Sequence, residues 1–260
     1  MALNAIKLTA DAIESAADKK DAGTGSAPAP KLAIVVPTLR EAENIRVVLN
    51  RIREALDPLN FPYELLVVDD DSQDGIEFIV QDLSDADARV RCLVRKNERG
   101  LGGAVLHGWK HTKAEVLGVI DADLQHPPEL LPQLWKAAED GYDVVLASRY
   151  APQGGLEQWH FARHLISRMA IWLTYPLQKK HIRVQDPMAG FFLVRRACLR
   201  DVELHNRGFK ILLEILVRGK VESVKEIPFT FGPRRAGVSK ASLEVGLDYF
   251  RLLYRLWRER

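Results

Sequence analysis

The sequence predicts an α/β protein: a three-layer α/β/α domain with a mostly parallel central sheet, to which amphipathic helices are added. Two observations predict this fold class. Residues 1–150 alternate short apolar runs with stretches of helical periodicity, the pattern of β-α-β units. Residues 151–260 instead contain long segments that mix large apolar side chains with arginine. With 47% apolar and 28% charged residues, the 260-residue chain has the composition of an ordinary globular protein.

The elements of the first half follow from their apolar spacing. Strands are expected at residues 32–37, 63–70, 90–95, 116–120 and 144–147. Helices are expected between them, at residues 41–56, 74–83, 100–110 and 128–140, with Gly141 just beyond the last. Short apolar strands separated by helices are typical of parallel strands that are buried on both faces.

The main domain is expected to begin near Lys31. Residues 21–30 have the Gly-, Ala-, Ser- and Pro-rich composition of a linker, so residues 1–30 are interpreted as a flexible segment and residues 31–240 as the domain. Residues 1–20 lack the apolar core of a signal peptide. The two cysteines do not form a disulfide framework, which favours a reducing, cytosolic environment.

The net charge of +2 conceals an asymmetry between the two halves. Residues 1–150 carry 17 Lys and Arg against 25 Asp and Glu, whereas residues 151–260 carry 20 against 10. A basic half favours an anionic partner: nucleic acid, an anionic membrane surface or a phosphorylated substrate. A solvated basic face is the alternative. Nucleic acid is disfavoured, because no aromatic–basic recognition motif lies on the expected strands.

Two segments of the basic half have the pattern of helices that lie in a membrane interface. One spans about residues 157–178 and the other residues 241–260, and both combine Trp, Tyr, Phe and Leu with arginines. Neither has the roughly 20 apolar residues that a bilayer-spanning helix needs. Core packing with solvated flanks is the alternative for each helix, but the presence of two favours contact with a membrane surface.

The motif Asp121-Ala122-Asp123-Leu124-Gln125 follows the apolar run 116–120 directly. An expected strand therefore ends in two carboxylates and an amide, at the edge where open α/β sheets bind ligands. These oxygens are hard ligands suited to Mg²⁺ or Mn²⁺, and such a metal keeps positions open for substrate phosphates. We interpret the motif as a metal–diphosphate site; the alternative is that Asp121 caps the following helix.

Other motifs exclude several classes of enzyme. The glycine run 100–103 lacks the spacing of a dinucleotide-binding loop, since position 105 is Val, and it follows the third expected strand instead of the first. No P-loop, Gly-x-Ser-x-Gly or zinc-binding spacing is present. The glycines are interpreted as positions of tight packing or of close backbone approach to a ligand.

Seven short motifs, in order along the chain, match a known family. They are Val36–Glu41, Val67–Gly75, Gly100–Gly102, Asp121–Pro127, Ser148–Tyr150, Arg207–Lys210 and Gly237–Lys240. Through these residues the chain resembles the family 2 glycosyltransferases with a GT-A fold, and within them the dolichol- or polyprenol-phosphate mannose synthases. The resemblance covers roughly residues 32–245. It departs from the family pattern at Leu39, usually aromatic, at Arg40, usually Asn, and at Asp71, usually Asn or Gly.

The resemblance implies a set of site residues. Those expected to bind the nucleotide-sugar are Pro37, Leu39, Glu41, Val68, Asp70, Asp121, Ala122, Asp123, Lys210, Arg234 and Lys240. Those expected to hold the metal are Asp121, Asp123 and Gln125, and those expected to bind the acceptor phosphate are Arg149, Arg163 and Ser167. Asp121, Asp123 and Arg149 are the expected catalytic residues. Asp186 either contacts the sugar or braces its loop.

The implied reaction is transfer of mannose from GDP-mannose to a polyprenyl phosphate, with inversion, dependent on Mg²⁺ or Mn²⁺. One alternative is the same reaction with another donor, such as UDP-glucose. A second and less favoured alternative is a saccharide acceptor. A phosphate monoester has a second pKa of about 6, so this acceptor needs no catalytic base near pH 7. The resemblance further implies a peripheral enzyme at the cytoplasmic face of a membrane, with or without a membrane-protein partner.

Overall fold

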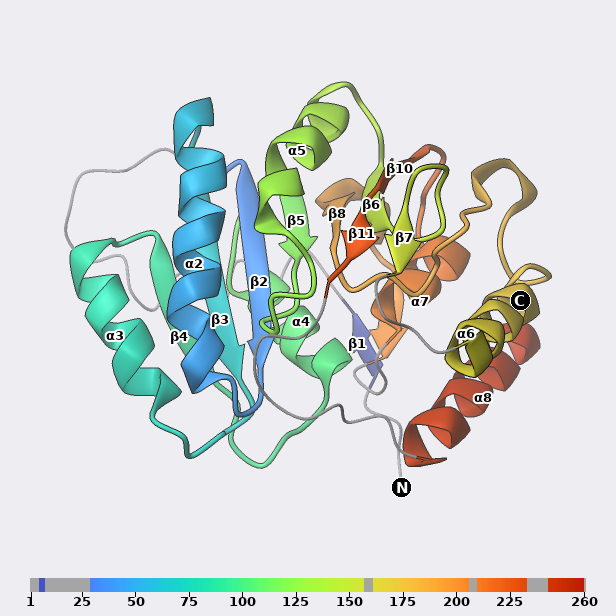
Figure 1. The fold of residues 1–260 in the computed structure, drawn as a ribbon, viewed down its shortest axis with the longest axis horizontal. Helices are drawn as coiled ribbons and strands as arrows, with labels where there is room; N and C mark the ends of the chain where they lie inside the picture. Colours follow the sequence, from blue (N-terminus) through green and yellow to red (C-terminus); the bar gives the residue numbers. More distant parts are fainter. Residues whose placement is uncertain (1–4, 8–28, 157–160, 206–209, 233–242, 260) are drawn as a thin grey trace.

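The computed structural model describes residues 5–7, 29–156, 161–205, 210–232 and 243–259. Within them the main sheet has seven strands in the spatial order β10-β6-β8-β5-β2-β3-β4 (Figure 1). These strands are β2 (Leu32–Thr38), β3 (Tyr63–Asp69), β4 (Val90–Val94), β5 (Val116–Val119), β6 (Val144–Ser148), β8 (Phe192–Arg195) and β10 (Val224–Pro228).

The sheet is mostly parallel, which confirms the expected fold class. Strand β2 pairs in parallel with β3 and β5, β3 pairs with β4, and β6 pairs with β10. Strand β8 runs antiparallel to both of its neighbours, β5 and β6. The five strands expected from the sequence all form, each within one residue of its expected bounds, whereas β8 and β10 were not predicted.

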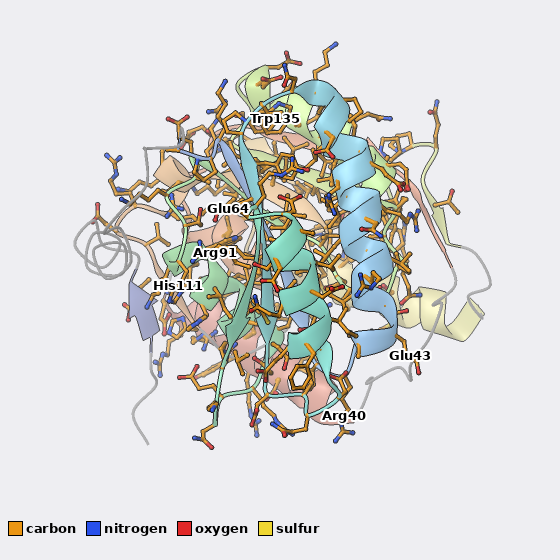
Figure 2. The ribbon with its side chains drawn as sticks, turned by 90° about the vertical axis from the view of Figure 1, so that its left-hand side faces the viewer. Arg40, Glu43, Glu64, Arg91, His111 and Trp135 are labelled. Carbon is orange, nitrogen blue, oxygen red and sulfur yellow. The ribbon has the colours of Figure 1, made fainter. Side chains whose placement is uncertain are left out.

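Helices cover both faces of this sheet. On one face α2 (Ala42–Leu56), α3 (Ile76–Ala86) and α5 (Leu131–Glu139) share an apolar cluster with the strands. Figure 2 shows α2 and α3 side by side along that face. On the other face α4 (Leu101–Lys110) and α7 (Ile211–Arg218) belong to a second cluster. The arrangement is the three-layer one that the sequence predicted.

Helices α6 (Phe161–Thr174) and α8 (Leu243–Arg258) form a separate unit beside α7 (Figure 1). They fall within the segments expected to be amphipathic, and the hydroxyl of Tyr249 in α8 donates a hydrogen bond to the carbonyl of Ala170 in α6, at 2.5 Å. Leu252 and Leu256 of α8 pack against Leu213 of α7. Across the described residues, no helix is both long enough and apolar enough to span a bilayer.

The remaining elements are short. Strand β1 (Ala5–Lys7) pairs antiparallel with β9 (Glu203–His205), and β7 (Gly155–Leu156) pairs in parallel with β11 (Thr230–Phe231). Single 3₁₀ turns span Asp57–Leu59, Pro128–Leu130, Lys180–Ile182 and Arg196–Leu199. Strand β1 was not predicted, and most of the expected linker, residues 21–28, lies outside the described residues.

Candidate active site

The sheet topology brings the sequence-predicted residues to one edge. Asp70 follows β3, Asp121 follows the end of β5, and Arg149 follows β6, so all three lie at the carboxyl ends of parallel strands. This is the edge where open α/β sheets bind ligands. Because β8 is antiparallel, the residues just before it also reach this edge, between β5 and β6.

The Asp121–Gln125 motif forms a tight turn that is tied to the end of β11. Leu124 has a left-handed backbone (φ 60°), and the backbone N–H of Gln125 donates to Oδ1 of Asp123, at 3.1 Å. The side-chain Nε2 of Gln125 donates to the carbonyl of Gly232, also at 3.1 Å. The following helical turns begin after Pro127 and Leu130 without a side-chain cap, so capping does not account for Asp121.

Asp121 lies against His126 and Gly190. Its Oδ2 is 3.7 Å from Nδ1 of His126, and a Cβ atom at Gly190 would overlap this same oxygen. His126 is buried beside the rings of Phe191 and Phe229, at centroid distances of 6.0 and 5.4 Å. Burial lowers the pKa of His126 to about 4, so the imidazole is neutral near pH 7.

Arg149 is held by Asp186 in a two-point ion pair. Its Nε and Nη2 donate to Oδ2 and Oδ1 of Asp186 at 2.7 and 2.8 Å, and the backbone N–H of Arg149 donates to Oδ2 at 3.1 Å. Asp186 is fully buried, and burial tends to lower the pKa of Arg149, but the paired carboxylate raises it. Asp186 therefore holds both the side chain and the backbone of Arg149.

Lys210 stands immediately before α7 and shares this environment. Burial and the nearby cation of Arg149 lower the pKa of the Lys210 ammonium group, while Asp186 and Asp121 act in the opposite direction. The ammonium group of Lys210 therefore interacts electrostatically with the guanidinium of Arg149 and with the two carboxylates, as part of one group of charges. Such a cluster of cations is suited to binding phosphate groups.

The expected nucleotide pocket lies at the ends of β2 and β3. Pro37, Leu39 and Glu41 are partly exposed, while Asp70 is buried and accepts a hydrogen bond from the backbone N–H of Gly100, at 2.7 Å. Burial raises the pKa of Asp70. The side chain of Val68 is completely buried in the core, so contact of this residue with a nucleotide would have to come from its backbone.

Two positions where the chain departs from the family pattern have left-handed backbone. Arg40 has φ 61° and Asp71 has φ 54°. Asn and Gly adopt this conformation with the least strain, which accounts for the residues usual at these positions. The backbone N–H of Arg40 donates to Oγ of Ser72, at 2.8 Å, and this Oγ donates to Asp69. These hydrogen bonds hold the loop in place.

The expected acceptor residues lie on and beside α6. The hydroxyl of Tyr150 donates to Oγ of Ser167 at 2.8 Å, and the guanidinium groups of Arg149 and Arg168 lie 5.5 and 5.8 Å from the Tyr150 ring. Arg163 belongs to α6, but its side chain lies outside the described residues, as do Arg234 and Lys240. Sequence reasoning missed Tyr150 as a link between Arg149 and Ser167, although it stands directly after Arg149.

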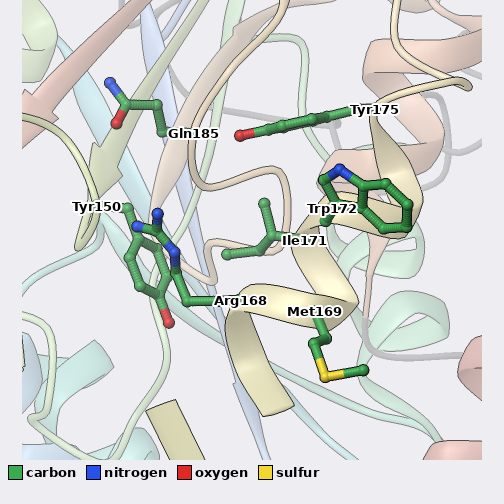
Figure 3. Close-up of a pocket in the computed structure, with 7 residues that line it drawn as sticks. All are labelled: Tyr150, Arg168, Met169, Ile171, Trp172, Tyr175 and Gln185. Carbon is green, nitrogen blue, oxygen red and sulfur yellow. The ribbon is translucent and has the colours of Figure 1, made fainter. Parts of the chain in front are cut away.

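A cavity of about 330 Å³ opens beside these residues (Figure 3). It is lined by Tyr150, Arg168, Met169, Ile171, Trp172, Tyr175 and Gln185. Its wall is mainly apolar and aromatic, with one guanidinium group. The cavity therefore lies between Tyr150, the residue after Arg149, and side chains of α6 that are exposed, among them Met169 and Trp172.

The motif 121–125 fits a divalent cation. Asp121 and Asp123 supply carboxylate oxygens, and the hydrogen bond from Nε2 of Gln125 orients its amide so that the oxygen is the end able to bind a metal. Glycine at position 190 leaves space beside Asp121 that any side chain would fill. A donor set of few protein oxygens, with room for substrate phosphates, is what Mg²⁺ uses in proteins.

Comparison with known proteins agrees with this geometry. The model of glycosyl transferase family 2 matches residues 33–203. Among solved structures, glucosyl-3-phosphoglycerate synthase from Mycobacterium tuberculosis, in complex with Mn²⁺, UDP-glucose and phosphoglyceric acid, superposes with a TM-score of 0.63 at 18% identity. That superposition covers 87% of this chain and 80% of the other. The chain belongs to glycosyl transferase family 2 and has the GT-A fold.

Within this family the chain is similar to proteins named dolichol-phosphate mannosyltransferase and polyprenol monophosphomannose synthase. A dolichol-phosphate mannosyltransferase from Pyrococcus furiosus is 43% identical over 228 residues, which are 88% of this chain and 64% of that protein. The enzyme of the same name from Saccharomyces cerevisiae is 37% identical over 86% of each chain. A polyprenol monophosphomannose synthase from Mycolicibacterium smegmatis is 32% identical, over 86% of this chain and 88% of its own length. The chain spans less than two thirds of the Pyrococcus protein.

Proposed function

We propose that this protein transfers mannose from GDP-mannose to a polyprenyl phosphate, with inversion at the anomeric carbon. The observation that carries the proposal is the meeting of two charged groups at one sheet edge: the carboxylates of Asp121 and Asp123, and the cations of Arg149 and Lys210. The carboxylates and Lys210 suit the metal-bound diphosphate of a nucleotide-sugar, and Arg149 suits an acceptor phosphate. The names of the relatives support mannose and polyprenyl phosphate as the two substrates.

The side chains of the site position two anions and offset their repulsion. Near pH 7 a phosphate monoester is largely dianionic, so the acceptor oxygen needs no base to become a nucleophile. Arg149 would bind the acceptor phosphate, with Arg163 and Ser167 as further ligands, and Lys210 would stabilise the diphosphate as it leaves. Arg234 and Lys240 would join Lys210. In the nucleotide pocket Pro37, Leu39, Glu41, Val68 and Asp70 would contact the nucleoside.

Mg²⁺ or Mn²⁺ would be held by Asp121, Asp123 and Gln125. When bound, such a cation neutralises charge that develops on the departing diphosphate. Ala122 is buried and stands between the two aspartates in the sequence, so its backbone would line the diphosphate site. Because the acceptor requires no proton transfer, the aspartates serve as metal and substrate ligands and need not act as bases.

A membrane surface would be the place of action, with the enzyme bound peripherally to the cytoplasmic face. Helices α6 and α8 both expose large apolar side chains: Leu165, Met169, Trp172, Leu173, Phe250, Tyr254 and Trp257. Exposed aromatic and leucine side chains among arginines are the pattern of helices that lie in the lipid interface. The cavity beside α6 would then face the layer in which the acceptor lipid resides.

The test is transfer of labelled mannose from GDP-mannose to a short-chain polyprenyl phosphate, with EDTA as a control and UDP-glucose in parallel. Lipid-linked label that requires GDP-mannose and is lost with EDTA is expected. Label from UDP-glucose alone would keep the fold and mechanism and change the donor. Nucleotide binding without any lipid-linked product would refute a lipid acceptor and direct attention to saccharides.

Two variants assign the roles within that assay. Asp123→Ala is expected to abolish turnover, and Arg163→Ala is expected to raise the KM for the lipid phosphate while leaving the KM for GDP-mannose unchanged. Asp85→Ala is a matched control, because Asp85 is an exposed carboxylate of α3 that accepts a hydrogen bond from the neighbouring Gln81. Full activity of Asp123→Ala would remove this residue from the metal site.

A further inference from the structure

The five residues Asp186–Gly190 occupy a special place in the topology. They lead into β8, the antiparallel strand that separates β5 from β6 in the sheet. Asp121 follows β5 and Arg149 follows β6, so the segment lies between the two halves of the site. It touches both: Asp186 holds Arg149, and Gly190 lies against the carboxylate of Asp121.

The segment is itself anchored at several points. The carboxylate of Glu226 in β10 accepts the backbone N–H groups of Gln185 and Asp186, at 2.9 and 3.3 Å. The N–H of Ala189 donates to the carbonyl of Asp186 at 3.2 Å, which closes a turn within the segment. The N–H of Ala147 in β6 donates to the carbonyl of Phe191 at 2.9 Å. These bonds fix the segment to both strands on the β6 side of the sheet.

Each end of the segment acts on its neighbour in a different way. Asp186 is fully buried and binds the Nε–Nη2 edge of Arg149 as well as its backbone N–H. A guanidinium held by two parallel hydrogen bonds keeps one orientation. The orientation of Arg149 toward a bound phosphate is therefore fixed before the phosphate binds. Gly190 acts by absence of a side chain, since a Cβ would displace the Asp121 carboxylate.

We propose that Asp186–Gly190 is a positioning segment that sets the geometry between the metal-binding carboxylate of Asp121 and the phosphate-binding guanidinium of Arg149. Asp186 is the positioning residue for Arg149, and Gly190 is the one for Asp121. The inference rests on the proposed function, because it assigns the acceptor phosphate to Arg149 and the metal to Asp121. It assigns no contact between Asp186 and the sugar.

Asp186→Asn tests the first half. The variant keeps the shape of the side chain and loses its charge, and we expect the KM for the polyprenyl phosphate to rise about tenfold, equivalent to about 1.4 kcal/mol, with the KM for GDP-mannose within about twofold. Arg149→Lys should show the same split. The double variant should be no worse than the poorer single variant, because both changes remove one interaction.

Gly190→Ala tests the second half. We expect the Mn²⁺ concentration for half-maximal activity to rise about tenfold while the KM for the lipid phosphate stays unchanged. Mn²⁺ binding followed by electron paramagnetic resonance should weaken by the same factor, in a measurement that needs no turnover. Two controls are matched: Asp143→Asn, a carboxylate that accepts backbone N–H groups of residues 222 and 223, and Gly155→Ala, where a Cβ meets only ordinary contacts.

Several results would overturn the inference. A rise in the KM for GDP-mannose with Asp186→Asn would make Asp186 a sugar ligand, and strict additivity with Arg149→Lys would remove the link between them. If Asp186→Asn does not fold, an unchanged acceptor KM in Arg149→Lys would overturn the inference instead. Failure of the wild-type enzyme to transfer any sugar would count against the proposed function, whereas Mn²⁺ binding by Gly190→Ala that equals the wild type counts against the positioning role alone.

Discussion

The carboxylate of Asp70 and the guanidinium of Arg95 lie 3.3 Å apart, and both side chains are almost completely buried. Arg95 also donates to the carbonyl of Gly100 at 3.2 Å, while the N–H of Gly100 donates to Asp70. The three residues thereby join the end of β3, the end of β4 and the start of α4. Gly103 makes room for this arrangement, since a Cβ there would lie 2.8 Å from a guanidinium nitrogen of Arg95. The expectation that these glycines allow tight packing is confirmed at Gly103.

Gly103→Ala should therefore disturb both stability and nucleotide binding. The added methyl group must push Arg95 away from Asp70, and overpacking of this kind costs about 1–3 kcal/mol. We expect a loss of that size in urea unfolding and a weaker affinity for GDP, measured by calorimetry. Gly155→Ala is the control, because the nearest atom to its Cβ would be 3.5 Å away. Wild-type GDP affinity in Gly103→Ala would separate the Asp70–Arg95 pair from the nucleotide pocket.

Glu214 should be a determinant of how α8 is attached to the domain. Its buried carboxylate lies 2.7 Å from Nδ1 of His205, 3.3 Å from Nε of Arg218 and 3.8 Å from a guanidinium nitrogen of Arg255 in α8. Glu214→Gln leaves these partners without the central charge, and we expect it to destabilise the fold by about 3 kcal/mol in urea unfolding. Glu222→Gln, at an exposed pair with His181, should change stability by less than about 1 kcal/mol. Equal effects of the two changes would contradict the structural role of Glu214.

His107 should make stability depend on pH below neutrality. Burial, together with the neighbouring His111 ring at a centroid distance of 4.4 Å, lowers the pKa of His107 from 6.5 to about 4. The folded state therefore takes up the proton less readily than the unfolded chain. The stabilisation is fully present above pH 6.5 and is lost as the pH falls towards 4. Because the side chain is only partly buried, we expect the loss to be about 1–2 kcal/mol.

The measurement is the free energy of unfolding between pH 7 and 4 for the wild type and His107→Leu. The variant should show a shallower decline over this range, since it has no imidazole to protonate. His181→Leu, at an exposed histidine, should keep the slope of the wild type. An unchanged slope in His107→Leu would mean that other groups carry the acid sensitivity.

Trp172 and Trp257 should anchor the protein to lipid. They are 69% and 67% exposed, on α6 and α8 respectively, and burying such a side chain stabilises binding by about 2 kcal/mol. Replacement of either by Glu is expected to reduce binding to vesicles of anionic phospholipid by more than about tenfold in a flotation assay. Phe78→Glu is the matched control, because Phe78 is 82% exposed on α3, a helix on the face of the main sheet. Equal losses for all three variants would argue against a defined membrane face.

The first half of the fold could be predicted from the sequence because each strand there is an uninterrupted apolar run. Strand β2 (Leu32–Thr38) is buried on both faces. Its apolar sequence predicts this burial without any information on which strands lie beside it. Strand β10 has the sequence Val-Lys-Glu-Ile-Pro, lies at the sheet edge and is only partly buried. Because it contains polar residues, it lacks the apolar run by which the other strands were predicted. Strand β8 is mostly apolar but only four residues long. It lies in the basic half of the chain, which was interpreted from its charge as a binding region and not as part of the sheet.

The part of the site that could be predicted from the sequence consists of motifs that directly follow an expected strand. The Asp121–Gln125 turn lies where the strand pattern placed it. The ion pair between Arg149 and Asp186 joins residues 37 positions apart, and the approach of Gly190 to Asp121 spans 69 positions, so neither is visible in local pattern. Both depend on the antiparallel insertion of β8. The burial of His126 depends on the same region, since Phe191, whose ring it contacts, directly precedes β8.

The place of β8 also determines the order in which the chain can fold. Strands β2, β3, β4 and β5 pair only with one another apart from the contact of β5 with β8, and all four precede residue 120. Within the part of the chain that the structure describes, β6 pairs with β8 and β10, which begin at least 44 residues after β6 ends. A nascent chain can therefore assemble strands β2 to β5 early. The rest of the sheet forms later, because its strands pair with partners that are distant in the sequence, and such pairings form slowly. Catalytic competence would arise in the final step, when β8 inserts between β5 and β6 and brings Asp121 and Arg149 into one site.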